Sequence, residues 1–143
     1  MTLRLPATVS AEVRRRGEQA YPAECCGALL GRMAEGKAKA VVRLAPVVNR
    51  RTDDPHRYLI GSDDLRRLET EARAEGLEIL GYYHSHPDHP PRPSAFDTEH
   101  AWPWYSYLIV RVEHGRAAEM ASWVLHDERP VMCPESLEVL SEV

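Results

Sequence analysis

Apolar and polar positions along the chain form short runs and helical stripes that follow one another in irregular order. Apolar runs of strand length and composition predict β-strands over residues 3–5, 26–33, 37–44, 58–60, 77–86, 105–112 and 117–125. Amphipathic stretches predict helices over 10–20, 62–75 and 94–102. Ser10 is the candidate N-cap of the first helix, and Ser62 opens the second. Residues 45–57 are typical of an exposed loop, and the segment from Pro130 onward of a weakly structured tail. We expect a mixed α/β fold in which two or three helices pack on a mixed sheet.

Length and composition then limit the class of protein. The chain has 143 residues, of which 43% are hydrophobic and 28% charged, so we expect a single globular domain over residues 1–143. The net charge of −4 lacks the basic excess that nucleic-acid binders carry. No apolar run approaches the roughly 20 residues of a membrane-spanning helix, and the first residues lack the apolar centre of a signal peptide. Three cysteines, two of them adjacent, indicate a reducing compartment, and we expect a soluble cytoplasmic protein.

Four of the seven histidines lie between positions 84 and 100. His84 and His86 stand two residues apart at the end of a predicted strand, so both rings project from one face of the sheet. Two such imidazoles can bind one divalent metal at Zn–N distances of about 2.0–2.1 Å. Asp97 follows on the first turn of the next predicted helix and can supply a third, anionic ligand. Three protein ligands with an open fourth position are typical of a catalytic zinc site.

Each half of this pattern also has a purely structural interpretation. Ser94 and Asp97 form a Ser-x-x-Asp arrangement that caps helices, and His-x-His can be two unrelated histidines. Both halves at this spacing would arise by chance about once in a thousand such chains, which favours the metal site. Hydrolysis also needs a carboxylate that is not a ligand, to carry a proton. The residue types alone leave several candidates open for this base, namely Glu18, Glu24, Glu35, Glu69 and Glu78.

The sequence His84-Ser-His-Pro, six residues, then Ser94-x-x-Asp97 resembles the signature of the JAMM (MPN+) zinc metalloproteases. The segment from Glu24 to Gly31, Glu-Cys-Cys-Gly-Ala-Leu-Leu-Gly, is similar to the strand that carries the catalytic glutamate of that family. Length and element order resemble a minimal prokaryotic JAMM domain. The resemblance implies a curved mixed β-sheet packed by two to three helices, in a JAMM/MPN-like (cytidine-deaminase-like) α/β sandwich. It implies one zinc ion with a bound water, held by His84, His86 and Asp97. It further implies Glu24 as general base and Ser94 as a donor to the tetrahedral intermediate.

The family's activity implies a zinc-dependent metallopeptidase or isopeptidase. Its substrate would be the C-terminus of a ubiquitin-like, sulfur-carrier-type protein ending in Gly-Gly, whether the enzyme trims it, releases an amino acid or cleaves a conjugate. Residues 46–57 and 87–93 are the candidate walls of a narrow channel for that tail. The alternative is a non-catalytic MPN-type scaffold or binding module, which the complete ligand set disfavours. Neither a Pro-Cys-x-x-Cys pair nor a His-Glu-x-x-His motif occurs, which excludes nucleobase deaminases and helical zinc proteases. The oligomeric state stays open, and His89 and His100 are expected to flank the site without binding metal.

Overall fold

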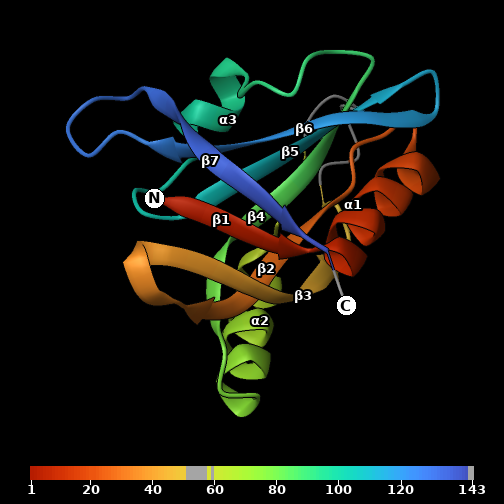
Figure 1. Cartoon of the computed structure of the whole chain (residues 1–143). Helices are drawn as coiled ribbons and strands as arrows, with labels where there is room; N and C mark the ends of the chain where they lie inside the picture. Colours follow the sequence, from red (N-terminus) through yellow and green to blue (C-terminus); the bar gives the residue numbers. More distant parts are fainter. Residues whose placement is uncertain (51–57, 59, 142–143) are drawn as a thin grey trace.

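The strands of the chain curl into a barrel in the computed structural model, which describes residues 1–50, 58 and 60–141 (Figure 1). Among the described residues the strands follow one another in the order β1-β3-β2-β4-β5-β6-β7, and β7 returns to pair with β1. The strands are β1 (Thr2–Pro6), β2 (Cys26–Met33), β3 (Ala38–Val47), β4 (Glu78–Pro87), β5 (Ser106–Glu113), β6 (Arg116–Leu125) and β7 (Met132–Leu140). The helices are α1 (Ala7–Ala20), α2 (Ser62–Ala74) and α3 (Ala95–Glu99), with a 3-10 turn, η1, at Glu35–Lys37.

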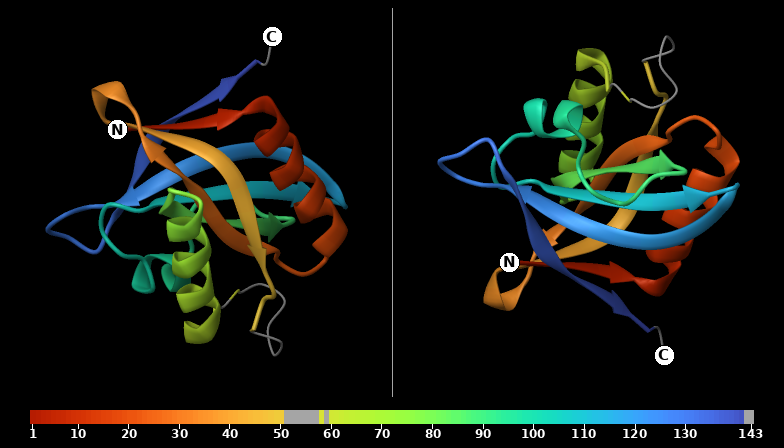
Figure 2. Two further views of the ribbon diagram at one scale, coloured as in Figure 1. Left: turned by 90° about the horizontal axis from the view of Figure 1, so that it is seen from below. Right: turned by 90° about the horizontal axis from the view of Figure 1, so that it is seen from above.

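Helices cover the sheet on two sides, which is why several strands read as continuous apolar runs (Figure 2). Helix α1 packs against strands on several sides of the barrel, including β1, β3, β5 and β6. Gly17 permits that contact, because a Cβ at this position would lie 2.9 Å from the Val112 side chain. Helix α2 packs mainly on β2 and β4, where Leu68 and Ala72 bury against Ala28 and Leu30.

Strand β4 lies between β2 and β5, where both of its edges are paired. It runs antiparallel to β2, with His84 opposite Cys26, and parallel to β5, with His84 opposite Ile109. Gly81 allows β5 to come close, since a Cβ there would meet the Ser106 carbonyl oxygen at 1.9 Å. The second half of β4 is fully buried, so the side chains it carries have fixed surroundings.

The predicted mixed sheet with helices packed on it is confirmed, but several predicted boundaries are wrong. Helix α1 begins at Ala7, directly after Pro6, and Ser10 lies buried within it instead of capping it. Helix α2 begins at Ser62, as predicted, and ends at Ala74, one residue before the predicted end. Strand β3 continues to Val47, because Ala45 is buried and pairs with Ala28, so residues 45–47 are not loop.

The predicted strand at 58–60 is not formed at positions 58 and 60, and position 59 lies outside the described residues. Residues 51–57 of the predicted loop also lie outside them. Helix α3 ends at Glu99, so the predicted helix to 102 is too long. Among the described residues, no helix is both long and apolar enough to cross a bilayer.

The predicted weak tail after Pro130 is also wrong, because these residues form β7. This strand pairs antiparallel with β6 and parallel with β1, and so closes the barrel. The sequence of β7 lacks a clear strand pattern, because most of its side chains are at least partly exposed and Pro134 interrupts the run. Its partners lie far away in the chain, which residue periodicity alone does not reveal.

Candidate metal centre

Three side-chain atoms from β4 and α3 converge on one point. The Nε2 atoms of His84 and His86 lie 3.1 Å apart, and each lies 3.2 Å from Oδ2 of Asp97. Tetrahedral zinc with ligand distances of about 2.0–2.1 Å separates its ligand atoms by about 3.3–3.4 Å. A zinc ion therefore fits against all three atoms with very little movement. Both rings are almost completely buried, so the surrounding side chains restrict their movement.

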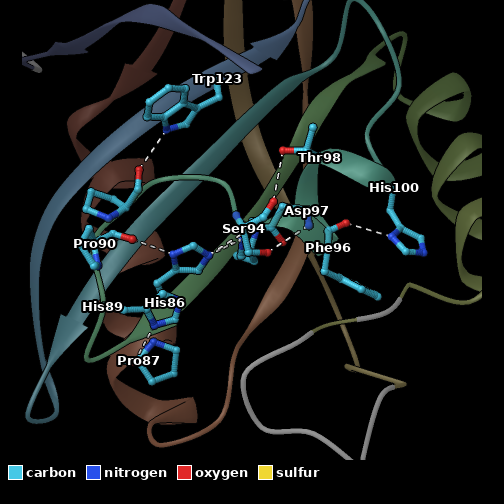
Figure 3. A network of polar contacts seen from close by, with 12 residues as sticks. His86, Pro87, His89, Pro90, Ser94, Phe96, Asp97, Thr98, His100 and Trp123 are labelled. Carbon is cyan, nitrogen blue, oxygen red and sulfur yellow. Dashed lines mark hydrogen bonds and ion pairs between the residues drawn. The ribbon is translucent and has the colours of Figure 1, made fainter. Parts of the chain in front are cut away.

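The backbone after β4 fixes which nitrogen of His86 faces this point. Nδ1 of His86 donates to the carbonyl oxygen of Pro90 at 2.7 Å, which leaves the lone pair of the neutral ring on Nε2 (Figure 3). The proline-rich segment is itself held to β6, because Trp123 Nε1 donates to the Pro91 carbonyl oxygen at 2.9 Å. The prolines thus place one carbonyl group where it orients a candidate metal ligand.

His84 is held by stacking. The ring of Tyr58 lies against it, with centroids 4.4 Å apart and an interplanar angle of 24°. Among the described residues, none hydrogen-bonds to Nδ1 of His84. The orientation of this ring therefore depends on packing more than on a polar contact.

Asp97 serves both as a helix cap and as a member of the cluster. Ser94 N donates to Asp97 Oδ2 at 2.9 Å, and Asp97 N donates to Ser94 Oγ at 3.0 Å, which is a complete capping box for α3. The capping and ligand interpretations of Ser-x-x-Asp are thus both compatible with the geometry. Burial acts to raise the pKa of Asp97, but the His84 and His86 rings and the Ser94 N–H hold it well below its ordinary value. The carboxylate is ionised and ready to face a cation.

Glu24 lies beside the cluster, in the segment before β2. Cys26 lies opposite His84, and continuing this antiparallel register by two residues brings Glu24 opposite His86. Carboxylate or ring-nitrogen atoms of Glu24, His86 and His89 lie within 4.8 Å of one another. The segment is tied down, because Asn49 Nδ2 donates to the Glu24 carbonyl oxygen at 3.2 Å.

A second pair of hydrogen bonds ties the same segment to β4. Cys25 N donates to Ser85 Oγ at 2.9 Å, and Ser85 N donates to the Cys25 carbonyl oxygen at 3.2 Å. Ser85, between His84 and His86, thus links β4 to the residue next to Glu24.

Burial separates the five glutamates that sequence reasoning left open. Glu24 is 3% exposed and adjoins the histidines. The other four are exposed and lie on other parts of the surface; they are Glu18, Glu35, Glu69 and Glu78. The geometry therefore brings together all five residues that the motif picks out, with Ser94 at the exposed rim.

A groove opens next to Asp97, which we call the aromatic groove. It has a volume of about 190 Å³, and Asp97 lies at its edge. Its aromatic lining residues are Tyr58, Tyr82, Phe96, Trp102 and Tyr107. A mostly apolar channel that reaches a charged cluster is suited to hold an extended chain with its reactive bond near the cluster.

Sequence reasoning gave no role to Tyr58 and only a flanking position to His89. His89 stacks under His86, with centroids 3.9 Å apart and an interplanar angle of 19°, while its Nδ1 contacts the Pro87 carbonyl oxygen at 2.8 Å. The His-x-x-His spacing of 86 and 89 was the signal available for His89. Tyr58 reaches His84 across 26 positions of sequence, and no local pattern predicts such a contact.

The fold is that of the JAB/MPN domains. The model of the family "prokaryotic homologs of the JAB domain" matches residues 6–126, and the chain belongs to this family. The resemblance seen in the sequence is thereby confirmed.

Two desampylases are similar in sequence. The one from Haloferax volcanii is 37% identical over 89 residues, which are 62% of this chain and 62% of that protein. The one from Pyrococcus furiosus is 29% identical over 108 residues, 76% of this chain and 71% of that protein. The match to the Haloferax protein thus spans less than two thirds of its length.

Solved structures agree on the fold. A protein from Desulfitobacterium hafniense superposes with a TM-score of 0.84 at 28% identity, covering 100% of this chain and 95% of that one. A protein from Salinibacter ruber superposes with a TM-score of 0.75 at 35% identity, covering 96% of this chain and 90% of that one. A JAB1/MPN domain protein from Archaeoglobus fulgidus gives 0.60 at 16% identity, covering 96% of each chain, which shows a common fold alone.

Proposed function

We propose that this protein is a zinc-dependent metallopeptidase or isopeptidase of the JAMM type. Its substrate is a peptide or isopeptide bond at the C-terminus of a ubiquitin-like, sulfur-carrier-type protein that ends in Gly-Gly. One observation carries the proposal: the three mutual distances of 3.1–3.2 Å among His84, His86 and Asp97, with a buried glutamate alongside. The similarity to two desampylases supports the choice of substrate class.

His84, His86 and Asp97 would hold the ion. Two neutral imidazoles and one carboxylate leave the bound cation with a net positive charge and room for a further ligand. Zinc held there would supply the Lewis acidity that activates a water molecule and polarises the scissile carbonyl group. The ordered prolines and the Tyr58 ring keep the two imidazoles in position for this work.

Glu24 acts as general base and then as general acid. Its carboxylate takes a proton from the attacking water and delivers it to the nitrogen that leaves when the C–N bond breaks. Its place opposite His86, outside the three-atom cluster, suits a proton carrier more than a ligand. Ser94 is exposed at the rim, and its Oγ accepts from Asp97 N. The hydroxyl proton remains available to stabilise the oxygen of the tetrahedral intermediate.

The aromatic groove would receive the Gly-Gly tail. Rings on its sides allow a flat, extended backbone to pass, and glycine lets that backbone come closest. Because Asp97 lies at its edge, a tail seated there would end near the cluster. A folded ubiquitin-like body would stay outside.

The direct test is to load the protein with zinc and incubate it with a sulfur-carrier protein whose Gly-Gly end bears a short peptide. Product masses should show cleavage after the second glycine. Treatment with a chelator should abolish cleavage, and added zinc should restore it. The Glu24→Gln variant serves as the matched control, because it keeps the metal ligands and removes the proton carrier.

Two results would argue against the proposal. Zinc-loaded protein that binds the carrier and releases no product would support the scaffold alternative. Cleavage that survives both chelation and Glu24→Gln would place the chemistry outside this cluster. The cytoplasmic location stays a prediction of the sequence.

A further inference from the structure

A buried ion pair lies inside the barrel, away from the metal centre. Lys39, near the start of β3, is completely buried, and its Nζ lies 3.8 Å from Oε2 of Glu135 on β7, whose side chain is 2% exposed. Burial lowers the pKa of Lys39, while the charge of Glu135 opposes that shift. Lysine and glutamate are almost never fully buried unless paired, so this pair calls for an explanation.

The pair belongs to a network that reaches the backbone of the segment 100–105, between α3 and β5. Lys39 Nζ donates to Ser106 Oγ at 2.9 Å and to the carbonyl oxygen of Trp104. It also lies 4.5 Å from the centroid of the Trp104 ring, within cation–π distance. Glu135 Oε1 accepts from Ser106 Oγ at 2.6 Å and from Ser122 Oγ at 2.8 Å. We call these residues the Lys39–Glu135 network.

Trp104 adopts a backbone conformation that needs such support. Its φ is 78°, in the left-handed region that a residue with a Cβ seldom occupies. Lys39 holds its carbonyl oxygen, and the ring packs against the core cluster. The network therefore fixes the course of the chain at this turn.

The same segment forms part of the aromatic groove. Trp102, two residues earlier, lines the groove, as do His100 and Tyr107. The Trp102 N–H donates to the Tyr107 hydroxyl oxygen at 2.8 Å. Trp102 is 68% exposed, so few packing contacts of its own hold it there. Its position therefore depends on the backbone on either side of it. On the C-terminal side, Lys39 fixes that backbone through the Trp104 carbonyl oxygen.

We propose that Lys39 and Glu135 are positioning residues for substrate binding, acting through Trp104 on the wall of the aromatic groove that Trp102 forms. The inference rests on the proposed function in one respect, namely that the groove holds the substrate's tail. The network itself contains none of the metal-facing residues, so its loss should weaken substrate binding without changing the chemistry.

The test uses variants that leave no buried charge unpaired. Lys39→Met with Glu135→Gln removes the hold on the Trp104 carbonyl, while the glutamine still accepts from both serines. Lys39→Leu with Glu135→Gln is a second double variant, in case the first fails to fold, and it too leaves no buried charge unpaired. The matched control is Glu138→Gln, which removes a carboxylate from the same strand, where Arg4 and Glu138 form a half-exposed pair at 3.5 Å.

Hydrogen–deuterium exchange gives a readout independent of activity. We expect faster exchange in residues 100–105, including the Trp102 amide, in the network variants and not in Glu138→Gln. With the peptide-extended sulfur carrier as substrate, KM should rise about 10-fold, which corresponds to a loss of about 1.4 kcal/mol of binding free energy. The kcat value should stay within about twofold, since the loss concerns binding in ground state and transition state alike. Zinc stoichiometry should not change.

Unchanged exchange in 100–105 in the folded double variant would overturn the proposal. So would a fall in kcat at constant KM, or an equal effect in Glu138→Gln. If the wild-type protein fails to cleave the carrier, it is the proposed function that fails. The exchange result then decides by itself whether the network positions the segment.

Discussion

Ser85 offers the sharpest test of how the site is assembled. It lies between His84 and His86, the candidate metal ligands on β4, is completely buried, and accepts a hydrogen bond from Cys25 N at 2.9 Å. Ser85→Ala would leave that N–H without its partner, at a cost of about 1–3 kcal/mol in the free energy of unfolding. For a chain of 143 residues this corresponds to a fall in Tm of roughly 3–10 °C.

The same change should reduce turnover more than it reduces binding. Cys25 is next to Glu24, so loss of the tie to β4 lets the carboxylate drift from its place opposite His86. A displacement of about 1 Å costs up to about 100-fold in rate, so we expect kcat to fall by roughly 10–100-fold. Zinc stoichiometry and KM should stay constant, because neither a ligand nor the groove is altered.

Thermal unfolding, zinc analysis and steady-state kinetics on Ser85→Ala and Ser85→Thr together decide the matter. The threonine keeps the hydroxyl and should recover most of both losses. Full activity in Ser85→Ala, or equal losses in the threonine variant, would refute the view that this hydrogen bond positions Glu24.

Three further expectations concern the site and the segment beside it. Glu24→Gln should keep one zinc per chain and lower kcat by about 10²–10⁴, measured with the peptide-extended carrier; full activity would place the base elsewhere. Asp97→Ala should lose stoichiometric zinc, whereas Ser94→Ala should keep it and lower the rate by about 10²–10³; metal analysis and kinetics separate the two. A hydrogen bond from the Tyr21 hydroxyl holds the pKa of Asp88 below its ordinary value, so the stability it provides is present above that value and is lost as pH falls through the lowered pKa. The Tm of Asp88→Asn should therefore lie below that of the wild type near neutral pH and approach it in acid; a constant difference would contradict this linkage.

The strands with strong local signals were predicted well. The β2 boundaries, Cys26–Met33, agree with the apolar run, and β4 was placed to within one residue at either end. His84, His86 and Asp97 were singled out by spacing alone, because alternation along a strand and a following helix turn fix where such side chains point.

What the sequence could not supply depends on contacts between distant segments. Among the five candidate glutamates, only the pairing of β2 with β4 places Glu24 opposite His86. Strand β7 escaped notice because its stability comes from β1 and β6 and from the buried contact of Glu135 with Lys39, not from its own composition. Tyr58 was predicted to lie in a short strand, whereas its ring stacks on His84, a residue far away in the sequence.

One oxygen of Asp97 couples the formation of helix α3 to the binding of an ion at the candidate metal centre. Oδ2 receives the Ser94 N–H that starts α3 and also faces both imidazoles. A helix of five residues is only marginally stable by itself, so α3 depends on that cap for its formation. Any cation drawn to this oxygen fixes the carboxylate in the rotamer the cap requires, and so favours the helix. Thermodynamic linkage is reciprocal, so a change that stabilises α3 raises the affinity for the cation by the same factor.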